Sequence, residues 1–181
     1  IIDWGNALNH PEVKSVFFGG GTPSYLPSEE INLIMRSVES AFGVVPMAEI
    51  TLEANPGDLT PSKLEAYLES GINRVSIGVQ SLSDRLLGLL GRRHSALEAV
   101  NAYRMSLASG FENISIDLMY GLPHQSLHEW EETLKDAVGL NPYHISMYCL
   151  TLEEGTPMER HVKSGQLPNP DSDLAADMYL N

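Results

Sequence analysis

The sequence predicts an α/β fold built from five consecutive βα units. Short apolar or β-branched runs alternate with longer amphipathic segments along the chain, which is the pattern of a parallel sheet with helical crossovers. Right-handed crossovers of this kind form either an open doubly wound sheet or a closed or partial barrel. The helical segments are similar in length and no Gly-x-Gly-x-x-Gly follows the first strand. We therefore favour a partial, TIM-like (β/α) barrel over a dinucleotide-binding sheet.

The predicted strands are short and mostly apolar, as strands buried on both faces should be. They comprise residues 13–18, 49–53, 74–78, 114–118 and 145–148. The first residues of the chain run straight toward the first of these strands.

Four predicted helices separate the strands, at residues 28–42, 60–70, 95–109 and 126–139. Ser28 is expected to cap the first helix, and Pro61 suits the first turn of the second. The predicted helix at residues 126–139 carries an apolar face, made of Leu127, Trp130, Leu134 and Val138. The sequence then ends inside what reads as a further helix.

Composition limits the classes of partner. The chain has 181 residues, of which 43% are hydrophobic, enough for one sizeable core. Its net charge of −13 comes from scattered acidic residues, which argues against a nucleic-acid partner. No apolar run is long enough to span a membrane, and the N-terminus lacks the features of a signal peptide. We expect a cytoplasmic protein.

Cys149 is the single cysteine of the chain. It excludes an intrachain disulfide and cannot alone hold an iron–sulfur cluster. A lone thiol at a strand end is interpreted as a small packing residue. The sequence has no initiator methionine, and we expect it to be an internal fragment.

Polar or glycine-rich residues follow every predicted strand, where such folds carry their functional groups. In chain order these are the run Gly19 to Thr22, then Glu53, Gln80, Asp117 and Thr151. No metal-ligand spacing of histidines and no Gly-x-Ser-x-Gly nucleophile motif occurs, so no metal ligand and no catalytic side chain is predicted.

Each strand-end group has a functional and a structural interpretation. Three consecutive glycines let a ligand approach the backbone, although a tight turn also uses them. A carboxylate at Glu53 or Asp117 suits the hydroxyl groups of a ribose; the alternative is a helix cap or a pairing with Arg74 or Arg92. The Asn-Pro-Gly-Asp segment after Glu53 is interpreted as an exit turn without chemistry.

The third strand and the segment after it supply further polar groups. Gln80 can donate and accept hydrogen bonds, or simply edge the core, and Gly78 indicates a close approach to the backbone. Arg92 and Arg93 follow an apolar run, and one of them is expected to hold a carboxylate through a bidentate fork while the other faces solvent. His94 is interpreted as a structural residue.

Five motifs in this order resemble the radical SAM proteins of the oxygen-independent coproporphyrinogen III oxidase family. They are Phe-Phe-Gly-Gly-Gly-Thr-Pro-Ser-Tyr-Leu (17–26), Thr-Leu-Glu-Ala-Asn-Pro-Gly-Asp-Leu-Thr (51–60), Asn-Arg-Val-Ser-Ile-Gly-Val-Gln-Ser (73–81), Gly-Arg-Arg-His-Ser (91–95) and Asn-Ile-Ser-Ile-Asp-Leu-Met-Tyr-Gly-Leu-Pro (113–123). The resemblance implies that the partial barrel is of radical SAM type. It also implies a radical SAM core over residues 1–165, with 166–181 starting a C-terminal region.

Within this family the chain is similar to the HemW-like branch, whose members act as haem chaperones. Glu-Ala-Asn-Pro (53–56), the segment Tyr-Cys-Leu-Thr-Leu-Glu-Glu-Gly-Thr-Pro (148–157) and Gly-Gln-Leu-Pro (165–168) are in the HemW style. HemN, the true oxidase, carries Glu-Ile-Asp-Pro and lacks the Glu-x-Gly-Thr-Pro segment. The resemblance therefore implies haem binding and delivery to respiratory haem proteins.

The resemblance also implies which residues bind S-adenosylmethionine. Gly20, Gly21 and Thr22 would line its methionine end. Glu53 and Gln80 would hold its ribose region, and Arg92 would pair with its carboxylate. Asp117 would lie beside the bound ligand, and Thr151 is a less secure contact.

The family's Cys-x-x-x-Cys-x-x-Cys loop, which ligates a [4Fe–4S] cluster, is absent from these residues. We expect it upstream, so the fragment alone should not cleave S-adenosylmethionine. No haem ligand can be named with the C-terminal region missing; His144 and Tyr148, expected near the barrel mouth, are the candidates. A homodimer and peripheral membrane association through partner proteins are compatible with this assignment.

Two functions from different classes follow, and a third is kept open. The first is a HemW-like haem chaperone carrying the cluster and S-adenosylmethionine. The second is a coproporphyrinogen III dehydrogenase acting on a porphyrinogen without oxygen. An unrelated βα barrel with a sugar or sugar-phosphate ligand is the third. The segment 153–157 and Glu-Ala-Asn-Pro favour the first.

Overall fold

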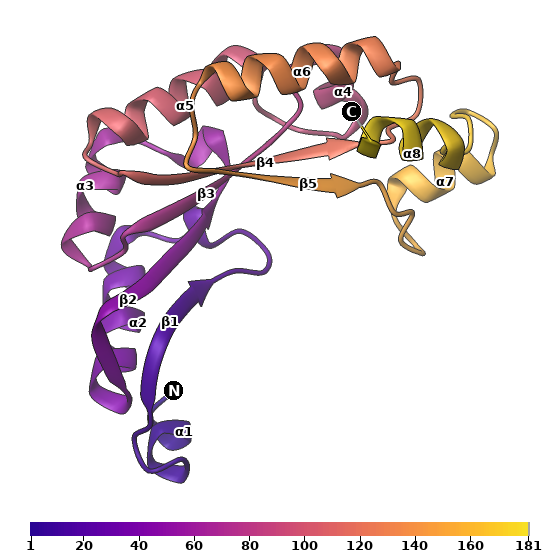
Figure 1. Cartoon of the computed structure of the whole chain (residues 1–181). Coiled ribbons are helices and arrows are strands. Elements are labelled where there is room, and N and C mark those ends of the chain that lie inside the picture. Colours follow the sequence, from indigo (N-terminus) through magenta and orange to yellow (C-terminus); the bar gives the residue numbers. More distant parts are fainter. Residues whose placement is uncertain (181) are drawn as a thin grey trace.

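The structure, a computed structural model, describes residues 1–180 and contains one parallel five-stranded sheet in the order β1-β2-β3-β4-β5. Figure 1 shows that the sheet curls into part of a barrel, with α2, α3, α5 and α6 along its convex side. The predicted partial TIM-like barrel with five βα units is therefore confirmed. The strands are β1 (Glu12–Phe18), β2 (Gly43–Ala54), β3 (Arg74–Gln80), β4 (Asn113–Tyr120) and β5 (His144–Cys149).

The four helices predicted between the strands are present, and residues 1–180 contain four others. The predicted helices are α2 (Ser28–Ala41), α3 (Pro61–Glu69), α5 (Ala96–Ala108) and α6 (Leu127–Gly139). The others are α1 (Ile2–Ala7), α4 (Asp84–Leu89), α7 (Pro157–Lys163) and α8 (Ser172–Leu180), with 3-10 turns η1 (Pro23–Tyr25) and η2 (Pro56–Asp58). The helix expected at the end of the chain is α8. None of the helices within residues 1–180 is long and apolar enough to cross a membrane.

The start of the chain differs from the prediction, because α1 precedes the first strand. This helix has a single buried residue, Gly5, and a Cβ there would lie 2.4 Å from the carbonyl oxygen of Ala41. The same carbonyl forms a hydrogen bond with Nδ1 of His10 (2.8 Å). Glycine thus permits a close contact between α1 and the end of α2, which sequence periodicity over six residues does not reveal.

Two predicted boundaries also change. β2 begins at Gly43, well before the predicted Glu49, because its first residues pair with Glu12 and Val13 ahead of a register shift in β1. Ser28 is not the cap of α2: Pro27 occupies the capping position and Ser28 is already helical. In α5 and α6, Ser95 and Ser126 do cap, each in a reciprocal capping box with a glutamate three residues on.

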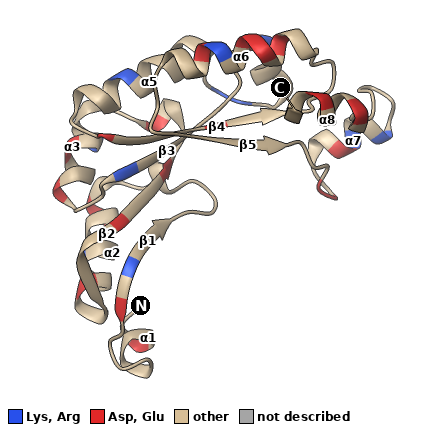
Figure 2. Ribbon diagram, in the orientation of Figure 1, with Lys and Arg blue, Asp and Glu red and all other residues tan. Residues whose placement is uncertain are grey.

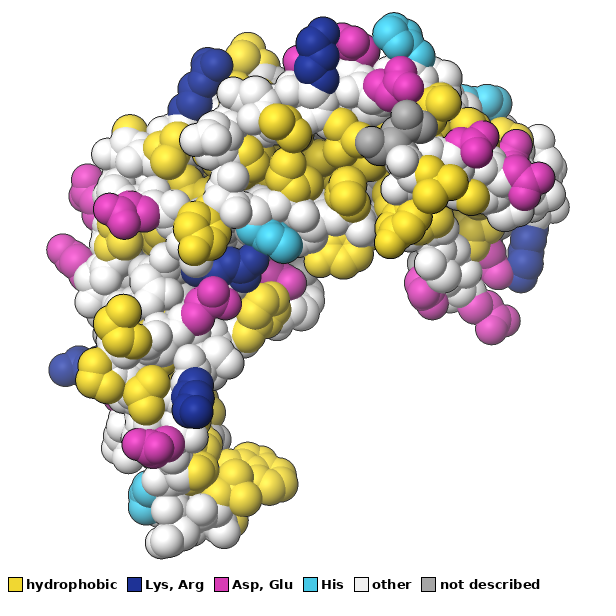
Figure 3. Space-filling model, in the orientation of Figure 1, with side chains coloured by type: hydrophobic (Ala, Val, Ile, Leu, Met, Phe, Trp, Pro, Cys, Tyr) yellow, Lys and Arg dark blue, Asp and Glu magenta, His cyan; other side chains and the backbone are white. Residues whose placement is uncertain are grey.

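The sheet has one apolar and one polar face. On the convex face, Leu52, Val75, Ile77, Ile114 and Ile116 are buried against the helices. On the concave face the register brings polar residues together, with Thr51 beside Arg74, Glu53 beside Ser76, and Asp117 beside Ser146. The expectation that both faces would be apolar is therefore wrong for the concave face, where Figure 3 shows the hollow of the curved molecule.

Charge is spread over the whole chain, as the sequence indicated. Figure 2 shows acidic and basic residues interspersed along helices and strands, from β1 near the N-terminus to α7 near the C-terminus.

Helix α6 is fixed to the sheet and to α8 through Trp130. Its ring lies 5.4 Å from that of Tyr120, and Nε1 donates to the carbonyl oxygen of Met178 (2.8 Å). Trp130 and Met178 are both 1% exposed. Val138, predicted on the same apolar face, is exposed, and Ala137 is buried instead. The predicted domain boundary after residue 165 stays a prediction.

We expect Trp130→Ala to lower the free energy of unfolding by about 3–5 kcal/mol, because it removes a buried aromatic ring and leaves a cavity. Trp130→Phe should cost less, about 1–2 kcal/mol, since it loses mainly the hydrogen bond to Met178. Urea unfolding followed by circular dichroism measures both. Val138→Ala, an exposed change on the same helix, is the control. Equal stability of the alanine and parent proteins would contradict this packing.

Candidate functional site

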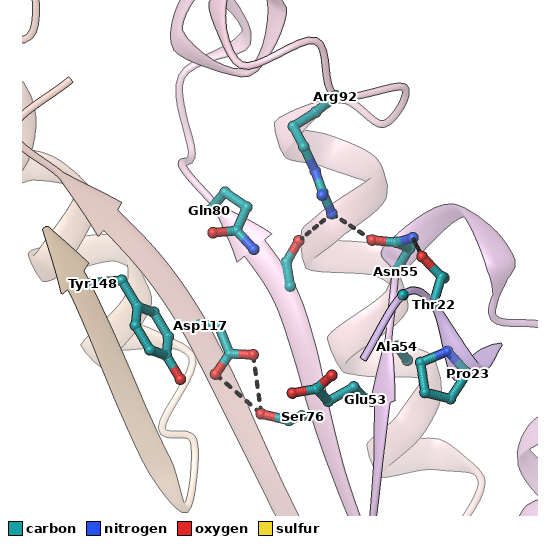
Figure 4. Close-up of a pocket in the computed structure, with 12 residues that line it drawn as sticks. Thr22, Pro23, Glu53, Ala54, Asn55, Ser76, Gln80, Arg92, Asp117 and Tyr148 are labelled. Atoms are coloured by element: carbon teal, nitrogen blue, oxygen red, sulfur yellow. Dashed lines mark hydrogen bonds between the residues drawn. The ribbon is translucent and has the colours of Figure 1, made fainter. Parts of the chain in front are cut away.

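The carboxyl ends of the strands surround a cavity of about 230 Å³ on the concave side. Figure 4 shows its side chains converging from all five βα units. Five of the eight predicted binding residues line it with their side chains, namely Thr22, Glu53, Gln80, Arg92 and Asp117, and Gly21 lines it with its backbone. The remaining lining residues are Pro23, Ala54, Asn55, Ser76, Gly78 and Tyr148.

The loop after β1 reaches this cavity at Gly21, whereas the predicted Gly20 is not among the lining residues. Gly20 and Gly21 have φ values of +77° and +58°, and a Cβ at either would meet nothing within 4 Å. The N–H of Gly20 donates to Oε2 of Glu53 (3.2 Å). A left-handed backbone with open space around it suits a ligand that contacts main-chain groups.

Glu53 and Asp117 face each other across Ser76, on β2, β4 and β3 respectively. The Ser76 hydroxyl lies 3.0 Å from each carboxylate oxygen of Asp117. Burial raises the pKa of the Asp117 carboxyl and the nearby Glu53 adds to this, against lowering by hydrogen bonds from Ser76 and Ser146 and by the charge of Arg74. Within residues 1–180 neither Glu53 nor Asp117 forms an ion pair; Arg74 pairs with Glu49 (3.9 Å). Neither carboxylate therefore lies within ion-pair distance of Arg74 or Arg92, although the charge of Arg74 still acts on Asp117 and lowers its pKa.

Gln80 is aimed into the cavity by a local irregularity of β3. The register with β4 shifts between Ile77 and Gln80, and Gln80 has a φ of +67°, which is uncommon for a residue other than glycine. Gly78 makes room for this arrangement. A Cβ at Gly78 would lie 3.0 Å from Nε2 of Gln80 and 3.4 Å from Nη2 of Arg92, so the expected close approach to Gly78 is made by these two side chains.

Arg92 enters the cavity from the segment between α4 and α5. Its Nη2 donates to Oδ1 of Asn55 and to the carbonyl oxygen of Gly78 (3.0 Å). A guanidinium can bind a carboxylate in a bidentate manner through Nη1 and Nη2 or through Nε and Nη2, and both pairs need an Nη2 hydrogen. Because Nη2 already donates to Asn55 and Gly78, the predicted bidentate contact is not available to a ligand in this arrangement. The N–H groups of Nη1 and Nε remain available. Burial lowers the pKa of Arg92, and Arg93 lowers it further, against an opposing effect of Asp58.

The neighbours of Arg92 have the structural roles expected of them. Arg93 is exposed, whereas His94 is buried, with Nε2 3.1 Å from the carbonyl oxygen of Val79. Burial lowers the pKa of His94. A second hollow of about 480 Å³ lies beyond Arg92, lined also by Gly57, Asp58, Arg93 and Glu98, so Arg92 stands between two openings.

The sequence did not lead us to predict Asn55 or Ser76 as residues that line the pocket. Asn55 was assigned to a turn without chemistry, yet it contacts Arg92 directly. The available signal was its position, directly after the strand that ends in Glu53 and Ala54 and before a proline. Ser76 lies two residues before Gly78 on the same face of β3, so alternation along the strand would have found it.

Three predicted positions lie elsewhere. Thr151 is exposed beyond the end of β5 and does not line the cavity. His144 begins β5, at the amino end of the sheet, so its expected place near the mouth is wrong, whereas Tyr148 does line the cavity. Cys149 is exposed, which contradicts its interpretation as a packing residue.

The donor set fits S-adenosylmethionine. Two carboxylates accept hydroxyl or ammonium hydrogens, an amide does both, and a guanidinium with free N–H groups meets a carboxylate. The residues present do not fit a [4Fe–4S] cluster, because the chain has one cysteine and residues 1–180 contain no group of three His, Cys, Asp or Glu placed to share a metal ion.

The curved parallel sheet with a polar pocket at its strand ends defines the class of fold, a partial (β/α) barrel with a binding site at its mouth. A sequence model of the Radical SAM superfamily matches residues 1–137. The chain belongs to this superfamily.

The chain is also similar in sequence to individual proteins of this superfamily. A bovine (Bos taurus) protein named radical S-adenosyl methionine domain-containing protein 1, mitochondrial, is 42% identical over 92% of this chain and 38% of its own length. Heme chaperone HemW of Synechocystis is 40% identical over 92% of this chain and 40% of HemW. The chain therefore spans about two-fifths of these relatives, and the predicted resemblance to the HemW-like branch is confirmed.

A solved structure supports the same fold. Coproporphyrinogen III oxidase (HemN) from Escherichia coli, described as a radical SAM enzyme, matches with a TM-score of 0.82 and 29% identity over 93% of this chain and 39% of that chain.

We expect Asp117→Asn to stabilise the protein at neutral pH, because burial disfavours the charged carboxyl in the folded state. The pKa of Asp117 in the folded state is raised above its ordinary value of 3.8. The destabilisation caused by the ionised carboxyl is therefore complete at pH values above the raised pKa, and it disappears at pH values below 3.8. Unfolding midpoints from pH 7 to pH 3 should therefore converge for the two proteins as the pH falls. A pH-independent difference would show that the carboxyl charge is not responsible.

Proposed function

We propose that the strand-end cavity binds S-adenosylmethionine. Gly20, Gly21 and Thr22 line its methionine end, Glu53 and Gln80 hold its ribose region, and Arg92 meets its carboxylate through Nη1 or Nε. Asp117 lies beside the ligand. The observation that carries this proposal is the convergence of opposite charges, with Glu53 and Asp117 on one side and Arg92 on the other, in one cavity. Thr151 is assigned no contact.

S-adenosylmethionine supplies a carbon radical when an adjacent reduced [4Fe–4S] cluster donates an electron to it. The single cysteine of these residues cannot supply the cluster ligands, and no further step is assigned to this chain. Its residues bind and orient the ligand, and the partial burial of the Asp117 carboxyl and the Arg92 guanidinium strengthens those contacts because it reduces screening by water.

We further propose that the whole protein is a HemW-like haem chaperone. The support is the 40% identity to a protein named heme chaperone HemW over nearly the whole chain. Haem and its respiratory recipients are then partners, and the cytoplasmic location, homodimer and peripheral membrane association stay predictions. The alternative, an oxygen-independent coproporphyrinogen III oxidase, is favoured by the fold match to HemN, at the lower identity of 29%.

We expect Glu53→Gln or Arg92→Ala in the full-length, cluster-containing protein to weaken S-adenosylmethionine binding by about ten- to hundred-fold. Each change removes a charge-assisted hydrogen bond in a partly buried site. Equilibrium dialysis under anaerobic conditions measures the dissociation constant. Glu65→Gln, an exposed change on α3, is the matched control. Unchanged affinity in both pocket variants would refute the assignment.

The chaperone and oxidase functions are separated by one assay. The full-length protein, reconstituted anaerobically with its cluster, is given coproporphyrinogen III, S-adenosylmethionine and a reductant. We expect no conversion, and we expect the purified protein to retain added haem. Conversion to protoporphyrinogen at a steady rate would instead identify an oxidase. The positive control is a coproporphyrinogen oxidase treated in the same way.

A further inference from the structure

The end of β3 has an unusual backbone at Gln80. The N–H of Ser81 donates to the carbonyl oxygen of Val79 (2.8 Å), and Gln80 between them has a φ of +67°. A hydrogen bond between residues two apart, with a positive φ at the residue between them, defines the rarer and more strained kind of γ-turn. Such a backbone costs free energy in a residue with a side chain, and it persists only where surrounding contacts hold it. A contact from outside the strand is therefore needed to fix this turn.

His94 makes that contact. Its Nε2 lies 3.1 Å from the same carbonyl oxygen of Val79, and the residue is 7% exposed. Because a carbonyl oxygen only accepts, Nε2 carries the proton and donates. Burial lowers the pKa of His94, so the ring is neutral at pH 7 and Nδ1 carries no proton. The geometry thus selects one tautomer and directs its N–H group at the acceptor of the turn.

The segment between α4 and α5 contacts two successive carbonyl groups of β3. Nη2 of Arg92 donates to the carbonyl oxygen of Gly78 (3.0 Å), and Nε2 of His94 donates to that of Val79. Both carbonyl groups belong to the stretch of β3 in which the register with β4 shifts. Arg92 lines the strand-end cavity, whereas His94 lines the second hollow and not the cavity. His94 therefore acts on the cavity only through the backbone that it holds.

We propose that His94 is a positioning residue for Gln80: its Nε2–H holds the carbonyl group of Val79 and so maintains the γ-turn that directs the Gln80 amide into the cavity. Figure 4 shows the Gln80 side chain at the end of β3, facing the cavity. The effect on a ligand rests on the proposed binding of S-adenosylmethionine. Without the donor the turn relaxes in part of the molecules, and the apparent affinity falls with the fraction that keeps it.

The first test is a double-mutant cycle on S-adenosylmethionine binding by the full-length, cluster-containing protein. His94→Leu retains an apolar side chain without a donor and should weaken binding roughly three- to ten-fold. Gln80→Ala should weaken it at least as much. Adding His94→Leu to Gln80→Ala should change the affinity by less than about two-fold, because the amide that His94 positions is then absent. Additive losses would indicate a merely structural role and overturn the proposal.

Rescue by a matched variant identifies the N–H group as the cause. The amide nitrogen of His94→Gln reaches about as far as Nε2 and also donates, so the affinity should return to within about two-fold of the unmodified protein. His94→Asn is too short to reach Val79 and should behave like His94→Leu. His128→Leu on α6, where the side chain is 80% exposed, is the control and should change nothing. Equal losses in His94→Gln and His94→Leu would contradict the role of the donor.

A measurement without ligand separates this inference from the proposed function. The Ser81 amide is the donor of the γ-turn, so His94→Leu should accelerate its hydrogen exchange several-fold, whereas His94→Gln should not. Unchanged exchange in His94→Leu overturns the inference even where S-adenosylmethionine binds. If the unmodified protein does not bind S-adenosylmethionine, the proposed function fails, and hydrogen exchange still decides the role of His94.

The unmodified protein provides a further measurement if His94→Leu does not fold. The nitrogen NMR shifts of the His94 ring, assigned by their loss in His94→Gln, report which ring nitrogen carries the proton. We expect the Nε2–H tautomer at neutral pH. The Nδ1–H tautomer would leave Nε2 without a hydrogen to donate to Val79 and would overturn the proposal.

Discussion

The parallel register of the sheet is the constraint on which the rest of the structure depends. Because side chains alternate between faces, pairing Leu52 with Val75 and Ile77 with Ile116 also fixes which residues face the hollow. The convex face buries apolar residues under helices and supplies most of the stabilisation. The concave face and the strand ends are then free to carry polar groups, all at the same edge because the strands are parallel.

The polar groups at this edge carry structural costs that the apolar face must offset. Asp117 is partly buried with Glu53 nearby, Gln80 has a left-handed backbone, and Arg92 lacks an acidic partner. Deeper in the concave face, Ser115 Oγ and Asn113 Oδ1 are buried without a hydrogen-bond partner among the described residues. Unfavourable local features of this kind cluster at functional sites.

Long periodic elements were predictable from the sequence, and short or irregular ones were not. Helices α2, α5 and α6 were predicted because the spacing of their apolar residues over several turns agrees with residues that favour the beginning and end of a helix. Helices α1 and α4 have six residues each, too few for a period to show. Strand β2 was cut short because its beginning, around Pro46, is exposed and pairs only with the edge strand β1.

The site was predictable where topology alone places a residue, as for Glu53 and Asp117 at strand ends. It was not predictable where function depends on a bond between two loops. The hydrogen bond between Asn55 and Arg92 joins residues 37 positions apart in the sequence. Local sequence spacing predicts neither this hydrogen bond nor the use of both Nη2 hydrogens of Arg92. The motif resemblance found Arg92 but not its support. Sequence motifs of this kind identify groups that touch a ligand, whereas the groups that orient them emerge only from the packing of loops.

The distribution of charge explains why a strongly acidic chain can present a cation to a ligand. The net charge of −13 is spread over exposed helices, where solvent and salt screen it. Inside the cavity, screening is weaker, so Glu53 and Asp117 on the sheet and Arg92 on the opposite segment act as separate poles. A ligand that carries both a positive centre and a carboxylate then has one favourable orientation. The local arrangement of charged side chains, rather than the total charge of the chain, therefore sets the electrostatic character of this pocket.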